Sequence, residues 1–100
     1  MYKRFMIRRA IIAILGRYTN PQALETVLLA PEFYSIFGTA ELPGDAVGII
    51  AEEWRSLTEL GYLKTVPGFD DYRGLTVIGR EFAERPAKMN MSAVFAGGGC

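Results

Sequence analysis

The sequence contains no histidine, and its single cysteine is the last residue, Cys100. One cysteine cannot form an intramolecular disulfide, and a zinc site has too few of its usual ligands. Nucleophilic triads lack their usual general base, because that base is a histidine. Asp70–Asp71 and Glu52–Glu53 are adjacent acids, and neighbours in sequence do not share one face of a helix or strand, so neither forms a catalytic pair. We therefore expect no metal, no cofactor and no enzymatic activity.

Long apolar runs are also missing. The uninterrupted run Ala10–Leu15 follows a basic N-terminal segment, but it is far too short to span a membrane. No small-residue cleavage pattern follows it, as a signal peptide would require. We expect a cytoplasmic protein with no membrane partner.

The composition favours one globular domain. The chain has 100 residues, of which 50% are hydrophobic and 12% are aromatic, enough for a modest core without a disulfide or metal. The periodic patterns end near Pro86, so we place the domain at residues 1–88 and a C-terminal tail at residues 89–100.

Charge is unevenly distributed although the net charge is zero. Residues 1–17 hold five basic residues and no acid, whereas residues 18–71 hold nine acids and two bases. A neutral sum does not favour general affinity for DNA, which depends on phosphate neutralisation, but a local basic patch can still provide it.

Apolar spacing of three and four residues predicts three helices. The first covers Lys3–Tyr18, and its main apolar stripe is formed by Ile7, Ala10, Ile11, Ile14, Leu15 and Tyr18. The second covers Pro21–Leu29, with Asn20 as N-cap and Pro21 at the first helical position. The third covers Ala46–Leu60. A shorter helical turn over Glu32–Phe37, closed by Gly38, lies between the second and the third helix.

The third helix has distinct apolar and polar sides. Asp45 is the candidate N-cap. Trp54 shares the apolar side with Val47, Ile50 and Leu57, which indicates a core residue and not a ligand-stacking one.

A hairpin and a last helix follow. Pro67 and Gly68 predict the turn, with Asp70 and Asp71 at its tip, and Tyr72–Val77 is expected to be the second strand. An interior glycine often marks a bulge, so we expect one at Gly74, which would turn both Tyr72 and Leu75 inward. The last helix is predicted over Gly79–Arg85.

Two motifs resemble winged helix-turn-helix regulators of bacteria and phages. They are L-x-x-L-G-Y-L at Leu57–Leu63 and Y-R-x-L-T-x-x-G-R-x-F at Tyr72–Phe82. The resemblance is closest to PadR- or MarR-like domains, with a weaker one to small winged-helix proteins of Mu-like phages. It implies a mainly α fold with a small β-hairpin (α+β): a three-helix core, a wing and a short C-terminal helix.

The resemblance also implies a transcriptional regulator that binds double-stranded DNA. In such proteins the third helix enters the major groove and the wing contacts the backbone. The reading face here would be Asp45, Gly48, Glu52, Arg55, Ser56 and Glu59. The candidate DNA contacts are Arg55, Ser56, Glu52, Lys64, Arg73 and Arg17.

A different function is favoured by the signs of these charges. The reading face holds three acids and one base, and the expected wing tip holds two acids where lysine or arginine is usual. Carboxylates repel the phosphates of DNA. The alternative hypothesis is therefore a protein-interaction module that binds a basic partner instead of DNA.

A second apolar strip lies on the first helix. Phe5 and Ile12 lie away from its main stripe, and such a strip is usually covered by something. The tail segment Met91–Ala96 folding back and a homodimer are equally good explanations. The candidate interface residues are Phe5, Arg8, Arg9, Ile12, Met91 and Phe95.

Overall fold

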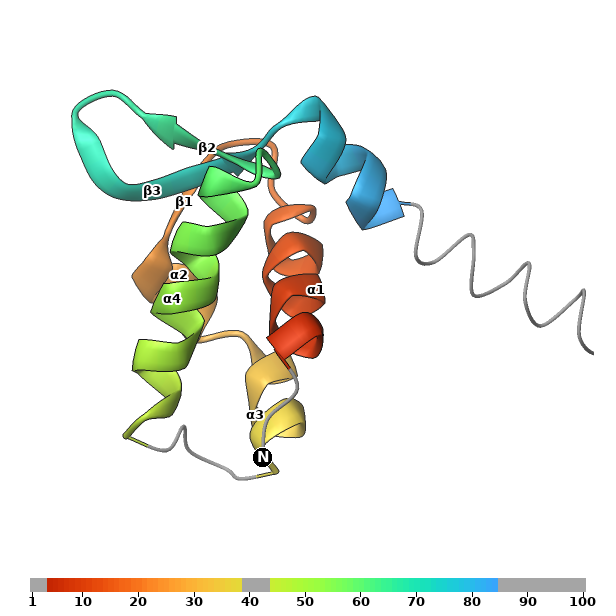
Figure 1. Ribbon diagram of the computed structural model, residues 1–100, viewed down its shortest axis with the longest axis vertical. Helices are drawn as coiled ribbons and strands as arrows, with labels where there is room; N and C mark the ends of the chain where they lie inside the picture. The colour runs from red at the N-terminus through yellow and green to blue at the C-terminus, as the bar shows by residue number, and fades with distance from the viewer. Residues whose placement is uncertain (1–3, 39–43, 85–100) are drawn as a thin grey trace, which may run out of the picture.

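The computed structural model describes residues 4–38 and 44–84 (Figure 1). Its elements, in chain order, are α1 (Arg4–Leu15), β1 (Gln22–Ala23), α2 (Leu24–Leu28), α3 (Pro31–Phe37), α4 (Ala46–Glu59), β2 (Leu63–Val66) and β3 (Phe69–Leu75). Residues 77–84 form a further helical segment. The fold is mixed α+β, as expected, with helices dominant. The predicted domain end at residue 88 and the tail lie outside the described residues.

Helices α1 and α4 run side by side and enclose the core (Figure 1). The predicted stripe of α1 is buried from Ile7 to Leu15, and only its last member, Tyr18, lies beyond the helix and is 37% exposed. Trp54 is 4% exposed, so its predicted place in the core is confirmed. The largest fully buried side chains are Phe33, Ile7, Ile11, Ile12, Ile14, Ile50, Leu57 and Val27.

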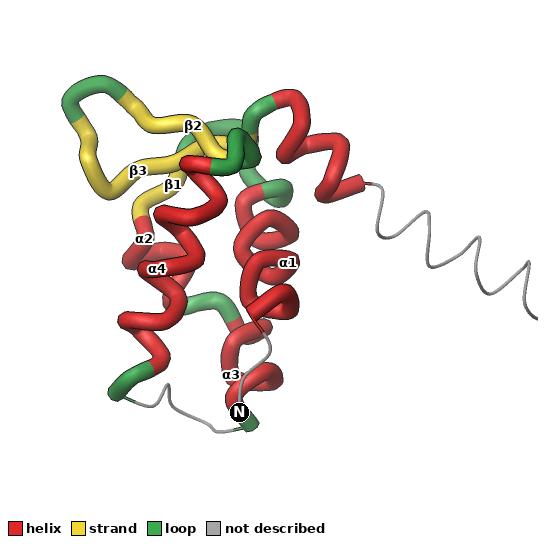
Figure 2. The backbone as a smooth tube through the Cα atoms, viewed as in Figure 1, coloured by secondary structure: helices red, strands yellow, loops and turns green. Residues whose placement is uncertain are grey.

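The sheet has three antiparallel strands in the order β1-β3-β2. Figure 2 shows the β2–β3 hairpin projecting past the end of α4, while the helical segment 77–84 leaves on the opposite side. Strand β1 pairs through Gln22 with Arg73 and through Ala23 with Tyr72. The sheet therefore joins the segment after α1 to the hairpin.

The predicted start of the second helix is wrong. The segment expected to be its first turn is strand β1, and α2 begins at Leu24 with Ala23 as an extended N-cap that makes no side-chain cap. Asn20 and Pro21 precede the strand. Pairing with β3, about fifty residues further along the chain, decides the conformation here, and a local capping signal cannot reveal it.

The two following helices agree with expectation, with local differences. Helix α3 has Pro31 in its first turn and ends at Gly38, whose φ of 72° is the left-handed conformation that glycine adopts readily. Asp45 occupies the N-cap position of α4, but its side chain makes no cap hydrogen bond. Val47, expected in the core, is 42% exposed.

The second strand differs from its prediction in register and length. Gly74 pairs regularly with Lys64, and the irregularity lies instead between Thr65 and Val66. Tyr72 is therefore 39% exposed and does not turn inward. Residues 70 and 71 lie within β3 instead of at the turn, which is formed by residues 67 and 68, and residue 77 is helical instead of extended.

The segment that carries the second motif, Tyr72–Phe82, packs closely against the end of α4. Helix α4 ends in a Schellman motif, in which the Tyr62 amide donates to the Leu57 carbonyl at 3.0 Å and Gly61 adopts a φ of 90°. Thr76 Oγ1 donates to the Gly61 carbonyl at 2.6 Å and accepts from the Gly79 amide at 3.0 Å. Thr76 thus caps the segment 77–84 and ties it to the α4–β2 connection.

Gly79 allows the closest contact at this junction. A Cβ at this position would lie 2.1 Å from the Tyr62 carbonyl oxygen. The rings of Tyr62 and Phe82 meet edge to face with centroids 5.4 Å apart. The spacing L-T-x-x-G-R-x-F therefore has a structural reason: a cap, a close backbone approach and a ring contact.

None of the helices within residues 4–38 and 44–84 is long and apolar enough to cross a membrane.

We expect Gly79→Ala to destabilise the fold by about 1–3 kcal/mol, because the added methyl group must displace backbone. The matched control is Gly48→Ala, since a Cβ on this exposed helical residue meets nothing within 4 Å. The control should stabilise the protein by about 0.5–1 kcal/mol through helix propensity. Urea unfolding measures both, and equal stability of the two variants would contradict the close approach at Gly79.

Candidate nucleic-acid interface

The outer face of α4 and the adjacent hairpin form the surface that the sequence predicts to contact DNA. Asp45, Gly48, Glu52, Arg55 and Glu59 are exposed along α4, and Ser56 is half-buried. The hairpin extends past the C-terminal end of this helix (Figure 1). One face of the molecule thus presents a free helix side next to a projecting hairpin.

Glu52 is partly neutralised by the first helix. Arg4 Nη1 donates to one carboxylate oxygen of Glu52 at 2.9 Å and to one of Glu53 at 2.9 Å. Arg8 Nε also donates to Glu53. Two predicted site residues, Arg8 and Glu52, therefore belong to an ion-pair cluster between α1 and α4, and the basic start of the chain is partly used inside the molecule.

Glu53 is the buried member of this cluster, and the sequence reasoning missed it. Its side chain is 5% exposed, whereas those of Arg4 and Arg8 are 49% and 39% exposed. It lies three residues after Ile50 and four before Leu57, on the edge of the apolar stripe, and this spacing was the available signal.

The ionisation of Glu53 is controlled by opposing effects. Burial raises the pKa of its carboxyl, but hydrogen bonds from Arg8 and Arg4 outweigh burial and hold the pKa below its ordinary value. The same contacts raise the pKa of Arg4, with the hydrogen bond to Glu53 as the largest cause. Both shifts favour the charged forms of Glu53 and Arg4.

Arg73 is half-buried and is held by contacts within the protein. Its Nε donates to Thr58 Oγ1 at 3.0 Å, its Nη1 donates to the Tyr72 carbonyl at 2.8 Å, and its guanidinium carbon lies 5.9 Å from the centroid of the Trp54 ring. These contacts tie β3 to the end of α4. Arg73, a predicted DNA contact, is thus occupied by structural contacts.

Arg17 is paired as well, since it forms an ion pair with Glu32 of α3. Of the predicted DNA contacts, Arg55 and Lys64 remain as cations whose side chains form no ion pair or hydrogen bond within the described residues. The exposed side chains of Arg9 and Arg80 likewise form no ion pair or hydrogen bond within the described residues. Arg80 was not among the predicted site residues.

The predicted apolar strip on α1 is only half present. Phe5 is 57% exposed, but Ile12 is 2% exposed and belongs to the core. Gly16, one turn after Ile12, lies against Ala83, because a Cβ on Gly16 would be 3.4 Å from that side chain. The helical segment 77–84 therefore meets this face of α1. Met91 and Phe95 lie outside the described residues.

The hairpin has an exposed aromatic pair that the sequence reasoning did not identify. The rings of Phe69 and Tyr72 meet edge to face with centroids 5.3 Å apart, and these residues are 56% and 39% exposed. Asp70 and Asp71 lie between them and are exposed. The hairpin thus presents two acids and two aromatic rings.

No group of three or more potential metal ligands among histidine, cysteine, aspartate and glutamate occurs in the described part of the chain. Comparison of the chain with protein families, with curated proteins and with solved structures gave no match.

Glu53→Gln should destabilise the protein by about 1–3 kcal/mol, since it leaves two arginines without their buried partner. This is less than the loss of a fully buried pair, because both arginines are partly solvated. Glu52→Gln is the control: this side chain is 58% exposed, so its loss should cost under about 1 kcal/mol.

The pH dependence gives a second test of the same cluster. The folded pKa of Glu53 is lowered, so its contribution is fully present above the unfolded pKa of about 4.3 and is lost as pH falls through the folded pKa. The difference in free energy of unfolding between the wild-type protein and Glu53→Gln should therefore shrink in acid. A difference that stays constant from pH 7 to pH 3 would exclude this role.

Proposed function

We propose that this chain is a winged helix-turn-helix protein that binds double-stranded DNA, a cytoplasmic transcriptional regulator of bacterial or phage origin. The observation that supports this best is the arrangement of α4 beside the β2–β3 hairpin, with β1 completing a three-stranded sheet in the order β1-β3-β2. In this proposal α4 is the recognition helix and the hairpin is the wing.

The dimensions of α4 suit a major groove. The helix has 14 residues, which makes it about 21 Å long, and with side chains a helix is about 10–12 Å across. The major groove of B-DNA is about 12 Å wide. The outer face of α4 is exposed at Asp45, Gly48, Arg55 and Glu59, and at Glu52 it contacts Arg4 of α1.

Arg55 is the cation best placed to contact DNA. It is exposed on the outer face of α4, and its side chain has no ion pair within the described residues. Arg4 offsets the charge of Glu52 on the same helix, which reduces the repulsion of phosphate. Arg55 can then bind a guanine edge or a phosphate oxygen.

A protein-interaction module is the second candidate, and the hairpin favours it. Asp70 and Asp71 beside the exposed rings of Phe69 and Tyr72 match a basic partner, whose arginines could form ion pairs and stack on the rings. The homodimer also stays a prediction, supported by the exposed side chain of Phe5.

Fluorescence anisotropy with a labelled random-sequence duplex at low salt tests DNA binding. We expect binding at micromolar protein that weakens as salt rises. Arg55→Gln should weaken it and reduce the slope of log K against log salt by about 1. Arg9→Gln is the matched control, an exposed cation on α1 that should change the slope less. No binding at low salt by the wild-type protein would contradict phosphate contact, and a genomic selection would then test for a specific operator.

The double variant Asp70→Lys, Asp71→Lys separates the two candidates. If the hairpin lies against DNA, the reversed charge should strengthen binding and increase the salt slope by up to about 2. If the hairpin binds a basic protein, the same change should abolish that interaction and leave DNA affinity unchanged. Anisotropy with the same duplex measures the first outcome, and an unchanged affinity would argue against the hairpin as a wing.

A further inference from the structure

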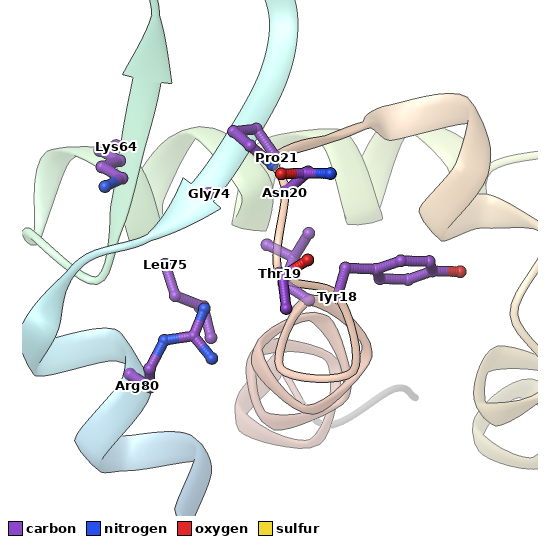
Figure 3. A pocket seen from close by; sticks show the side chains of 9 residues that line it. Tyr18, Thr19, Asn20, Pro21, Lys64, Gly74, Leu75 and Arg80 are labelled. Atoms are coloured by element: carbon purple, nitrogen blue, oxygen red, sulfur yellow. The ribbon is translucent and has the colours of Figure 1, made fainter.

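A small pocket lies where the loop after α1 meets the sheet and the helical segment 77–84 (Figure 3). Its volume is about 90 Å³. Leu75 forms an apolar part of its wall, and Thr19 and Asn20 supply polar groups from the loop. Lys64 from β2 and Arg80 from the segment 77–84 add two positive charges, so three distant parts of the chain converge here.

The charge in this pocket has one sign. No carboxylate lines it, and both cations are exposed, with side chains that make no ion pair or hydrogen bond within the described residues. Glu81 and Glu84 line a more open hollow next to it, which shares Lys64 and Arg80. The pocket itself therefore offers two unpaired cations and uncharged donors to a ligand.

Both cations are attached to fixed backbone. The amide of Arg80 donates to the Thr76 carbonyl at 2.9 Å, within the turn that Thr76 caps and ties to the α4–β2 connection. Lys64 pairs with Gly74 across the sheet. A Cβ on Gly74 would lie 3.5 Å from Lys64 Cε and 3.4 Å from Pro21 Cγ, so the lysine stem lies over this glycine.

We propose that this pocket binds a single phosphate group, with Lys64 and Arg80 as its charge partners and Thr19 and Asn20 as hydrogen-bond donors. Ionised donors make the stronger hydrogen bonds to phosphate, and the planar guanidinium of arginine can donate two in parallel. The phosphate group can belong to the DNA backbone, which rests on the proposed function, or to free phosphate, which does not.

Thermal unfolding with inorganic phosphate tests the site directly. Phosphate, compared with chloride at equal ionic strength, should raise the Tm of the wild-type protein with a saturating dependence on concentration. The double variant Lys64→Gln, Arg80→Gln should lose the saturating part. Arg9→Gln, which removes an exposed cation of α1 that does not line the pocket, should keep it.

General stabilisation by phosphate as a salt would raise the Tm of all three proteins alike, and that result would overturn the proposal. The substituted side chains are exposed, so without phosphate the variants should unfold at a Tm close to that of the wild type.

The DNA titration then identifies the source of the phosphate group. If the pocket binds backbone phosphate, the double variant Lys64→Gln, Arg80→Gln should reduce the salt slope by about 2. An unchanged slope together with the lost Tm response supports free phosphate as the ligand. A Tm response in a protein that binds no DNA supports the pocket and counts against the proposed function, whereas DNA binding without a Tm response overturns the pocket.

Discussion

The backbone carbonyl of Tyr62 is the point on which the arrangement of the C-terminal half depends. Gly79 approaches this oxygen so closely that a Cβ would lie 2.1 Å away, and the amide of Thr76 donates to it at 3.1 Å. The amide of the same residue closes the Schellman motif of α4, and its ring packs against Phe82. One short segment thus fixes the end of α4, the start of β2, the end of β3 and the direction of the helix after it. The position of Arg80, and with it the pocket it shares with Lys64, follows from this junction.

Electrostatics divides the basic residues of the described ranges 4–38 and 44–84 into two groups. Arg4, Arg8, Arg17 and Arg73 are engaged inside the molecule, in ion pairs or hydrogen bonds that connect α1 to α4, the α1 end to α3, and β3 to α4. Arg9, Arg55, Lys64 and Arg80 remain for an external partner. The acids of the hairpin remain as well. Any function on the α4 face therefore depends on a few single cations instead of a broad basic surface.

The helices and the hairpin were largely predictable because their signals are local. The periodicity of α1 and α4, the proline and glycine that bound α3, and the glycine at the end of α4 each act within a few residues. The errors occur where a distant segment decides. Strand β1 forms because β3 is its neighbour, the register shift lies opposite Thr65 and Val66 instead of at Gly74, and Ile12 is buried on a face that the segment 77–84 meets. Of the candidate site, the exposure of Arg55 and Lys64 was predictable, but the pairing of Arg8, Arg17, Glu52 and Arg73 was not.

The sequence by itself determined the α+β composition, the core positions of Trp54 and of the α1 stripe, and the exposed polar side of α4, because these depend on spacing within one element. Only the tertiary structure decided which charges are free. An ion pair such as Arg8 with Glu53 joins residues 45 positions apart, and the attraction depends on a separation that exists only after the helices have packed. The same holds for the pocket of Lys64 and Arg80, which no single segment contains. Packing converts a chain of zero net charge into a surface with distinct acidic and basic sites.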